Sequence, residues 1–133
     1  SQGGYQSAFL AGMDRRVTSA ILTVPAGLDQ GARLKGRKNS WPDTMKEYEA
    51  STMKNSPYFD GALWLRHTHA DIWCEIGMYD FTCPAANLFA TFNGVKAHKE
   101  IVLWQRPHSL YPGQDHGDLG ARRREAFQKA VDK

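Results

Sequence analysis

Two kinds of hydrophobic pattern alternate along the chain. Short runs rich in β-branched and apolar residues, bounded by Pro, Gly or polar turn residues, predict strands at residues 18–24, 72–76 and 100–104. Between these runs, apolar residues recur at helical spacing, most clearly after Pro84. This second pattern predicts helices at residues 4–13, 42–51, 56–65, 84–95 and 118–132.

The order of the predicted elements favours an α/β fold with a parallel sheet, because strands alternate with helices that can connect one strand to the next. The strand at residues 100–104 is nearly all apolar, which predicts burial on both of its faces. Residues 26–42 combine glycines and charges without a period, and they predict a long surface loop. Because three strands make a thin sheet, we expect the N-terminal half of the sheet to lie before residue 1.

The second predicted strand carries two acidic residues, Asp71 and Glu75, where a buried strand should be apolar. Burial of an unpaired carboxylate is strongly unfavourable. We therefore expect this strand either to be exposed or to pair its carboxylates with arginine.

The composition fits one domain spanning residues 1–133, with 41% hydrophobic residues available for a core. No apolar run is long enough to cross a membrane, so we expect a soluble protein without a membrane partner. Cys74 and Cys83 are too few for a disulfide framework, and their spacing is not that of a zinc site. Neither they nor the N-terminal residues indicate a cellular compartment.

The formal net charge of +3 comes from the last predicted helix. Residues 121–133 hold five Arg and Lys against two acidic residues, and the charges of the other residues balance. A basic helix without an aromatic ladder or a recognition-helix pattern is typical of a solvated surface. We therefore expect no nucleic-acid partner.

Candidate catalytic side chains follow the second and third predicted strands. Asp80 lies in the loop after residues 72–76, and His108 lies in the loop after residues 100–104. Because the carboxyl ends of parallel strands meet at one edge of a sheet, these side chains can meet there. The carboxylate could then hold the imidazole in one tautomer and stabilise its charged form.

A third candidate lies at the start of the chain, where Ser1-Gln2-Gly3-Gly4 leads into a helix. The second half of the G-x-S-x-G nucleophile elbow has this form, with small glycines that let the helix approach closely. Ser1 would be the nucleophile, and the backbone N–H of Gln2 would donate to the oxyanion. The absence of an initiator Met and of the first half of the motif suggests a fragment or a processed chain.

Other residues offer weaker candidates. His116 is a competing base, but His108 follows its strand directly. His67 and His69 have no third ligand nearby, so we expect no metal site. Cys83 is expected to pack beneath the loop of Asp80 as a small apolar group. Trp41, in the long loop, could line the rim of a sugar-binding site.

These residues lie in segments that resemble the acetyl xylan esterase and cephalosporin C deacetylase family of α/β-hydrolases. The stretch Gly77–Pro84 (GMYDFTCP) resembles the loop that carries the acid of that family, and AANLFATFNGV with the strand after it is similar to the segment leading to the base. SQGGYQSAFLAGMDRRVTSAILTVPAGLD resembles the nucleophile helix and the next strand, and SPYFDGALWLR is similar to the helix before the acid strand. The resemblance extends from Ser1 to about His108.

The resemblance implies the C-terminal half of an α/β-hydrolase domain, with Ser1 as nucleophile, Asp80 as acid and His108 as base. The implied reaction removes acetyl groups from acetylated carbohydrates such as xylan and xylo-oligosaccharides, with cephalosporin C as a further substrate. No metal or organic cofactor is implied. The partners it implies are the missing N-terminal half of the domain and further identical subunits.

Three alternatives stay open. S-x-G-G-Y also opens the nucleophile helix of prolyl-oligopeptidase-like peptidases, although the Asp80–Pro84 loop favours an esterase. An N-terminal nucleophile hydrolase would use the amine of Ser1 as base, but such enzymes have stacked antiparallel sheets. The chain could also be a truncated hydrolase half without activity, which folds only with a partner.

Overall fold

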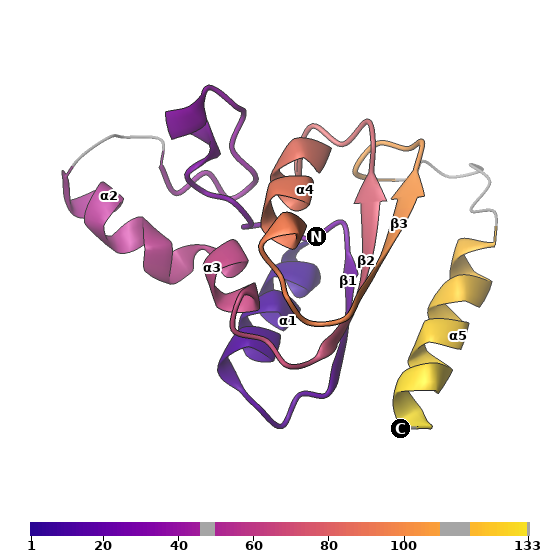
Figure 1. The fold of residues 1–133 in the computed structure, drawn as a ribbon. Coiled ribbons are helices and arrows are strands. Elements are labelled where there is room, and N and C mark those ends of the chain that lie inside the picture. Colours follow the sequence, from indigo (N-terminus) through magenta and orange to yellow (C-terminus); the bar gives the residue numbers. More distant parts are fainter. Residues whose placement is uncertain (46–49, 110–117, 133) are drawn as a thin grey trace.

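The computed structural model describes residues 1–45, 50–109 and 118–132. Helices and strands alternate along the chain, as the sequence predicts (Figure 1). In chain order they are α1 (Gln2–Met13), β1 (Ser19–Thr23), the 3-10 helix η1 (Ala32–Lys35), α2 (Ala50–Asn55), the 3-10 helix η2 (Ser56–Phe59), α3 (Gly61–Leu65), β2 (Asp71–Gly77), α4 (Ala85–Asn93), β3 (Lys99–Trp104) and α5 (Leu119–Val131).

The three strands form a parallel sheet in the order β1-β2-β3, which confirms the predicted α/β class. Leu22 of β1 pairs with Cys74 of β2, and Cys74 pairs with Ile101 of β3. All three strands run in the same direction, so their carboxyl ends lie at one edge (Figure 1). A parallel sheet does not match the stacked antiparallel sheets expected of an N-terminal nucleophile hydrolase.

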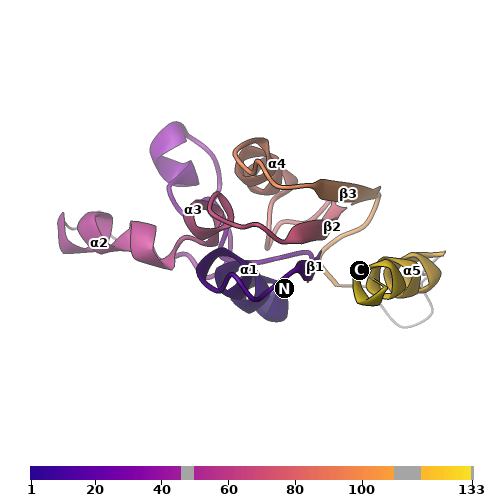
Figure 2. The same cartoon turned by 60° about the horizontal axis from the view of Figure 1, so that its bottom comes forward.

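Helices cover both faces of the sheet, with α1, α3 and α4 on one side and α5 on the other (Figure 2). Alternate residues of β2 point to opposite faces, because side chains of a strand alternate. Ile72, Cys74 and Ile76 belong to the larger core with α1, α3 and α4. Trp73 belongs to a smaller core with Val102 of β3 and Leu119 of α5.

The prediction that the last strand is buried on both faces is wrong. Of β3, only Val102 is buried, and the side chain of Leu103 is 54% exposed. The physical reason is position: β3 borders the described part of the sheet, so it has a single neighbouring strand and incomplete cover.

The prediction of a surface loop over residues 26–42 is wrong in part, although residues 33–36 are exposed. Ala26, Leu28 and Ala32 are completely buried, and η1 forms within the segment. The segment is held by the buried carboxylate of Asp60, which accepts hydrogen bonds from the backbone N–H groups of Asp29 and Gln30 at 2.9 and 2.8 Å.

Asp60 also divides the single helix predicted at residues 56–65. It is the N-cap of α3 and accepts a hydrogen bond from the N–H of Ala62 at 2.9 Å, so η2 ends before it and α3 begins after it. The helix predicted at residues 42–51 is wrong in its first turn, because residues 42–45 form bends and turns. Residues 46–49 lie outside the described residues, and residues 50 and 51 begin α2.

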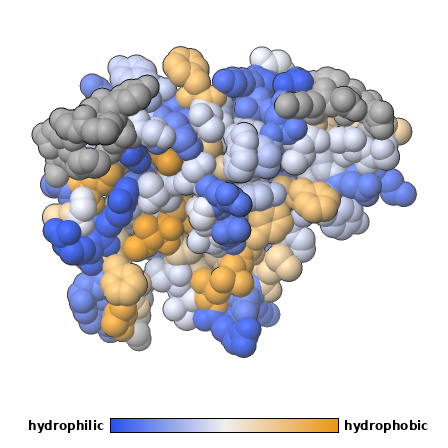
Figure 3. Space-filling view, turned by 180° about the vertical axis from the view of Figure 1, so that it is seen from behind, coloured by the Kyte–Doolittle hydropathy of each residue, from blue (hydrophilic) through white to orange (hydrophobic). Residues whose placement is uncertain are grey.

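The outer edge of β1 has no strand partner among the described residues. Seen from behind, hydrophobic side chains gather over the lower middle of the molecule beside α5 (Figure 3). A groove of about 330 Å³ lies between α5 and the start of the sheet. None of the described helices is both long and apolar enough to cross a membrane.

Candidate active site

Asp80 is fixed in the turn that follows β2. Its N–H donates to the carbonyl of Gly77 at 3.2 Å, and its side chain is fully buried. One carboxylate oxygen, Oδ1, accepts hydrogen bonds from the N–H groups of Thr82 and Cys83, each at 2.8 Å. The other oxygen is thereby left to face the neighbouring loop.

That neighbouring loop follows β3 and lies directly against the turn of Asp80. The N–H of Met78 donates to the carbonyl of Trp104 at 2.8 Å, and the N–H of Tyr79 donates to the carbonyl of Arg106 at 3.1 Å. Gly77 permits this approach, because a Cβ there would lie 2.9 Å from the carbonyl oxygen of Arg106. Side chains on the two loops can therefore meet.

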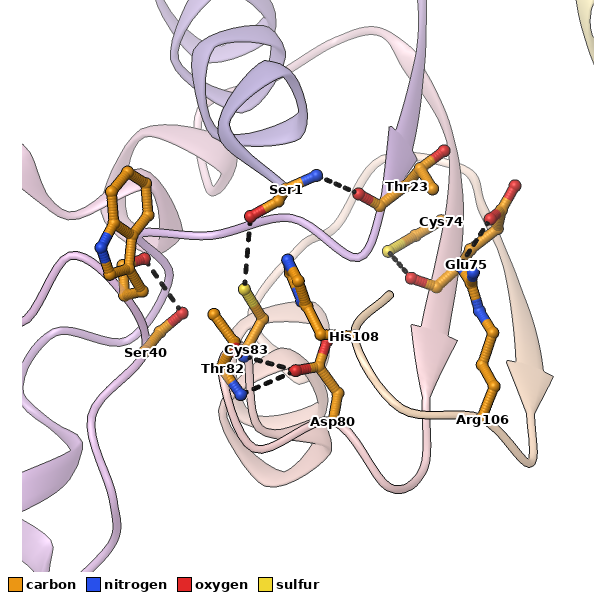
Figure 4. A network of polar contacts seen from close by, with 11 residues as sticks. Ser1, Thr23, Ser40, Cys74, Glu75, Asp80, Thr82, Cys83, Arg106 and His108 are labelled. Carbon is orange, nitrogen blue, oxygen red and sulfur yellow. Dashed lines mark hydrogen bonds and ion pairs between the residues drawn. The ribbon is translucent and has the colours of Figure 1, made fainter. Parts of the chain in front are cut away.

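His108 meets Asp80 as the sequence predicts. Nδ1 of His108 lies 2.7 Å from Oδ2 of Asp80, and the histidine side chain is 20% exposed (Figure 4). A neutral imidazole that donates from Nδ1 to a carboxylate leaves Nε2 free to accept a proton. The pair thus has the arrangement of a general base and its orienting acid.

Ser1 is the N-cap of α1, next to the end of β1. Its carbonyl accepts hydrogen bonds from the N–H groups of Tyr5 and Ala26, and its amine donates to the carbonyl of Thr23 at 2.8 Å. The predicted need for a small residue holds at Gly4, where a Cβ would lie 2.9 Å from atoms of Pro25. A small residue is not needed at Gly3, where a Cβ would meet no atom within 4 Å.

The Ser1 side chain points into the same site as the acid–base pair (Figure 4). Its Oγ lies 3.9 Å from Sγ of Cys83. Sγ in turn lies within 4.8 Å of a carboxylate oxygen of Asp80 and a ring nitrogen of His108. The three predicted catalytic side chains and Cys83 therefore gather at one end of the sheet.

Cys83 is completely buried, as predicted, and it packs beneath the site. Burial, and next the negative charge of Asp80, raise the pKa of the Cys83 thiol to about 11. Asp80, Cys83 and His108 are metal-binding residue types within reach of one another, but the thiol would have to lose its proton to bind an ion. The set fits an acid–base pair with a neutral thiol better than it fits a metal site.

The other predicted site residues lie around this cluster. Gln2 is exposed and begins α1, and Trp41 is 49% exposed. Trp41 is held by its backbone, since its N–H donates to the carbonyl of Thr82 at 2.9 Å and its carbonyl accepts from Gly27 at 2.7 Å. A hollow of about 440 Å³ lies beside it, with Arg33, Lys38, Asn39, Ser40, Pro42, Asp43, Phe81 and Thr82 as its other lining residues.

The remaining histidine candidates do not join the site. His67 and His69 are exposed near the end of α3 and belong to no metal-binding group among the described residues. His116 lies outside the described residues. Phe81 also lines the hollow beside Trp41, and its place next to Asp80 in the sequence is the signal from which this could be predicted.

The fold is shared with many solved structures. The chain matches the crystal structure of acetyl xylan esterase 1 from Thermoanaerobacterium sp. JW/SL YS485 at a TM-score of 0.76 and 22% identity, over 98% of this chain and 43% of that one. It matches acetyl xylan esterase from Paenibacillus sp. R4 at 0.76 and 24% identity, over 96% and 43%. An α/β hydrolase from Penicillium sp. sh18 matches at 0.67 and 15% identity, over 98% and 61%.

The parallel sheet with helices on both faces is therefore part of an α/β-hydrolase fold. At the level of sequence, the profile of the acetyl xylan esterase family matches residues 38–129, and the chain belongs to that family. Acetyl esterase Axe7A from Xylanibacter ruminicola is 27% identical over 106 residues, which are 77% of this chain and 24% of that protein. The chain thus spans about a quarter of this curated relative and less than half of the two solved esterases.

Proposed function

We propose that this chain supplies the catalytic triad of a serine esterase that removes acetyl groups from acetylated carbohydrates. The observation that carries the proposal is the 2.7 Å contact between Nδ1 of His108 and Oδ2 of Asp80, with Ser1 gathered at the same end of the sheet. Membership of the acetyl xylan esterase family supports the choice of acetyl esters as substrates.

In the proposed reaction, His108 takes the proton of the Ser1 hydroxyl as its oxygen attacks the acetyl carbonyl. The N–H of Gln2, which is unused within the first turn of α1, donates to the oxyanion. His108 then gives this proton to the sugar oxygen as its bond to the acetyl carbon breaks, so the sugar leaves as an alcohol and an acetyl-serine remains. Water activated by His108 attacks this ester, which releases acetate and restores the Ser1 hydroxyl.

Asp80 has the role of orienting and stabilising His108 through each proton transfer. Its Oδ1 is occupied by two backbone N–H groups, so only Oδ2 is directed at the imidazole. A carboxylate held in this way favours the charged imidazolium that forms during attack.

The carbohydrate is proposed to lie along the hollow beside Trp41. An exposed indole can pack on the apolar face of a pyranose, and Phe81, 76% exposed, offers a second aromatic ring at the same hollow. Xylan and xylo-oligosaccharides are the substrates we propose first, with cephalosporin C as a smaller acetyl ester.

We further propose that a segment outside residues 1–133 completes the domain along the open edge of β1. The chain covers 43% of each of the two solved esterases, which supports a larger complete sheet. That segment would also supply the second donor of the oxyanion hole.

A peptidase is the second candidate. Dipeptidyl peptidase 4 from Porphyromonas gingivalis matches at a TM-score of 0.72, but the identity is 10% and the match reflects the fold alone. Family membership favours the esterase, and a chain without activity is the remaining alternative.

The test uses the intact protein that contains this chain, with p-nitrophenyl acetate as substrate and a fluorophosphonate as probe. We expect acetate release, one adduct located on Ser1, and neither result in Ser1→Ala. Ser7→Ala, which changes a serine elsewhere in α1, is the matched control and should keep full activity. Absence of both turnover and adduct in the intact protein would contradict the esterase proposal.

A further inference from the structure

Glu75 is a fully buried carboxylate in the middle of the sheet. Its side chain is 0% exposed and lies on the face of β2 that Trp73 shares, toward α5. A buried charge is costly unless it is paired, and Glu75 has two arginine partners. Arg106 Nη2 donates to its Oε2 at 3.2 Å, and Arg123 contacts both oxygens, with Nη2 at 2.6 Å from Oε2. The expectation that this strand pairs its carboxylate with arginine is thus confirmed for Glu75.

The first partner, Arg106, belongs to the loop that carries the candidate base. It lies two residues before His108, and its side chain is 10% exposed. Its carbonyl accepts the N–H of Tyr79 from the turn of the candidate acid, while its guanidinium reaches Glu75 beneath the sheet edge (Figure 4). The loop is therefore fixed both by its backbone and by its side chain.

The second partner, Arg123, comes from α5, which packs on this face of the sheet through Leu119 and Ala126. Its Nε and Nη2 both donate to Glu75, so the guanidinium fork faces the carboxylate in a bidentate manner. Arg123 therefore contacts the carboxylate of Glu75 from α5, and Arg106 contacts it from the loop of His108. Glu75 thus links the loop of His108 to α5.

We propose that Glu75, Arg106 and Arg123 form a positioning network that keeps His108 within hydrogen-bonding reach of Asp80. The expected loss of turnover rests on the proposed esterase function, whereas the expected change in the contact between His108 and Asp80 does not. A loop displaced by a fraction of an ångström would lengthen the 2.7 Å contact between Nδ1 of His108 and Asp80. A misplacement of about 1 Å can reduce turnover by about 100-fold even when the altered residue is remote from the reacting atoms.

The test compares Arg123→Gln with Arg124→Gln in the intact protein. Both variants remove one positive charge from α5, but Arg124 is exposed and makes no ion pair among the described residues. The first readout is the low-field proton resonance of the Nδ1–H of His108, identified by its absence in Asp80→Asn. The second readout is the separate measurement of kcat and KM with p-nitrophenyl acetate.

For Arg123→Gln we expect a shifted or lost resonance and a kcat lowered by about 10- to 100-fold with KM nearly unchanged. Arg124→Gln should match the wild type in both readouts. Arg123→Lys keeps the charge but loses the bidentate fork, so it should fall between them, and it replaces Arg123→Gln if that variant does not fold.

A wild-type resonance and wild-type kcat in Arg123→Gln, with only a lower Tm, would overturn the proposal and leave a purely structural ion cluster. A wild-type protein without esterase activity would contradict the proposed function instead. In that case the resonance still decides whether the network positions His108.

Discussion

At the scale of single residues, the carboxylate of Asp80 is fixed by more hydrogen bonds within the described part of the chain than the imidazole of His108. Three hydrogen bonds converge on its carboxylate, two from backbone N–H groups and one with His108. The N–H groups of Thr82 and Cys83 cannot move without unfolding the turn, so the carboxylate has a fixed position and orients the imidazole of His108.

The first prediction concerns the carboxylate of Asp80. Asp80→Asn keeps the size of the side chain but removes the charge that favours the imidazolium, and it can present an N–H where an acceptor is needed. We expect kcat of the intact protein to fall by about 10⁴-fold with a small change in KM. Asp132→Asn, at the end of α5, is the control for loss of one carboxylate. Turnover of Asp80→Asn within tenfold of the wild type would contradict the assigned role.

The second prediction concerns the buried thiol beside Ser1. With a pKa raised to about 11, the Cys83 thiol stays protonated at pH 8, and ionisation grows only as the pH approaches 11. Because the thiolate is the reactive form, iodoacetamide at pH 8 should leave Cys83 unmodified in the folded protein and alkylate it after denaturation. Peptide mass spectrometry, which separates Cys83 from the other free cysteine, Cys74, measures the alkylation before and after denaturation. Rapid alkylation of the native protein at pH 8 would contradict this protonation state.

Much of the site can be predicted at this scale. The contact between Asp80 and His108 could be predicted because each lies in the loop after a strand, and parallel strands bring such loops together. The two arginines that neutralise Glu75 could not be assigned, since one of them reaches it from a helix 48 residues further along the chain. Sequence patterns describe local periodicity, but they do not show which distant cation meets a buried carboxylate.

At the scale of elements, the contact between the loop of Asp80 and the loop of His108 depends on Gly77 at the end of β2. The third prediction is that Gly77→Ala disturbs this contact, because its Cβ would lie 2.9 Å from the backbone oxygen of Arg106. A backbone atom cannot move aside as a flexible side chain can, so we expect kcat to fall by about tenfold or more and Tm to decrease.

Gly31→Ala is the matched control for this substitution. Gly31 precedes η1 with φ of −81°, and a Cβ there meets no atom within 4 Å. Thermal unfolding by circular dichroism and steady-state kinetics should both leave Gly31→Ala close to the wild type. Equal behaviour of the two variants would show that the loops tolerate a wider separation.

The elements themselves were predicted well where the pattern is strong and less well where tertiary contacts decide. The runs at residues 72–76 and 84–95 gave β2 and α4 with small changes at their ends. The exposure of β3 and the burial of residues 26–42 depend on neighbours that periodicity does not reveal. The break before α3 follows from one side chain, Asp60, which caps the helix and binds two distant N–H groups.

At the scale of the whole molecule, the outer edge of β1 is the dominant feature. Its backbone groups face no strand among the described residues, and an open strand edge promotes pairing with other chains. The fourth prediction is that the isolated 133-residue chain unfolds over a broad thermal range and self-associates, whereas the intact protein unfolds in a sharper transition. Circular dichroism and size-exclusion chromatography test this. A sharp transition of an isolated monomer would contradict it.

The backbone of Trp41 is tied on one side to Gly27, after β1, and on the other to Thr82, after β2. The backbone that carries the Trp41 ring is already bound at two strand ends, so this backbone does not have to be ordered when the proposed carbohydrate binds. We therefore expect the proposed carbohydrate to bind to a preformed surface, without the closing of a lid. On such a surface, a higher solvent viscosity would slow only the diffusional encounter of enzyme and substrate, and kcat would stay constant.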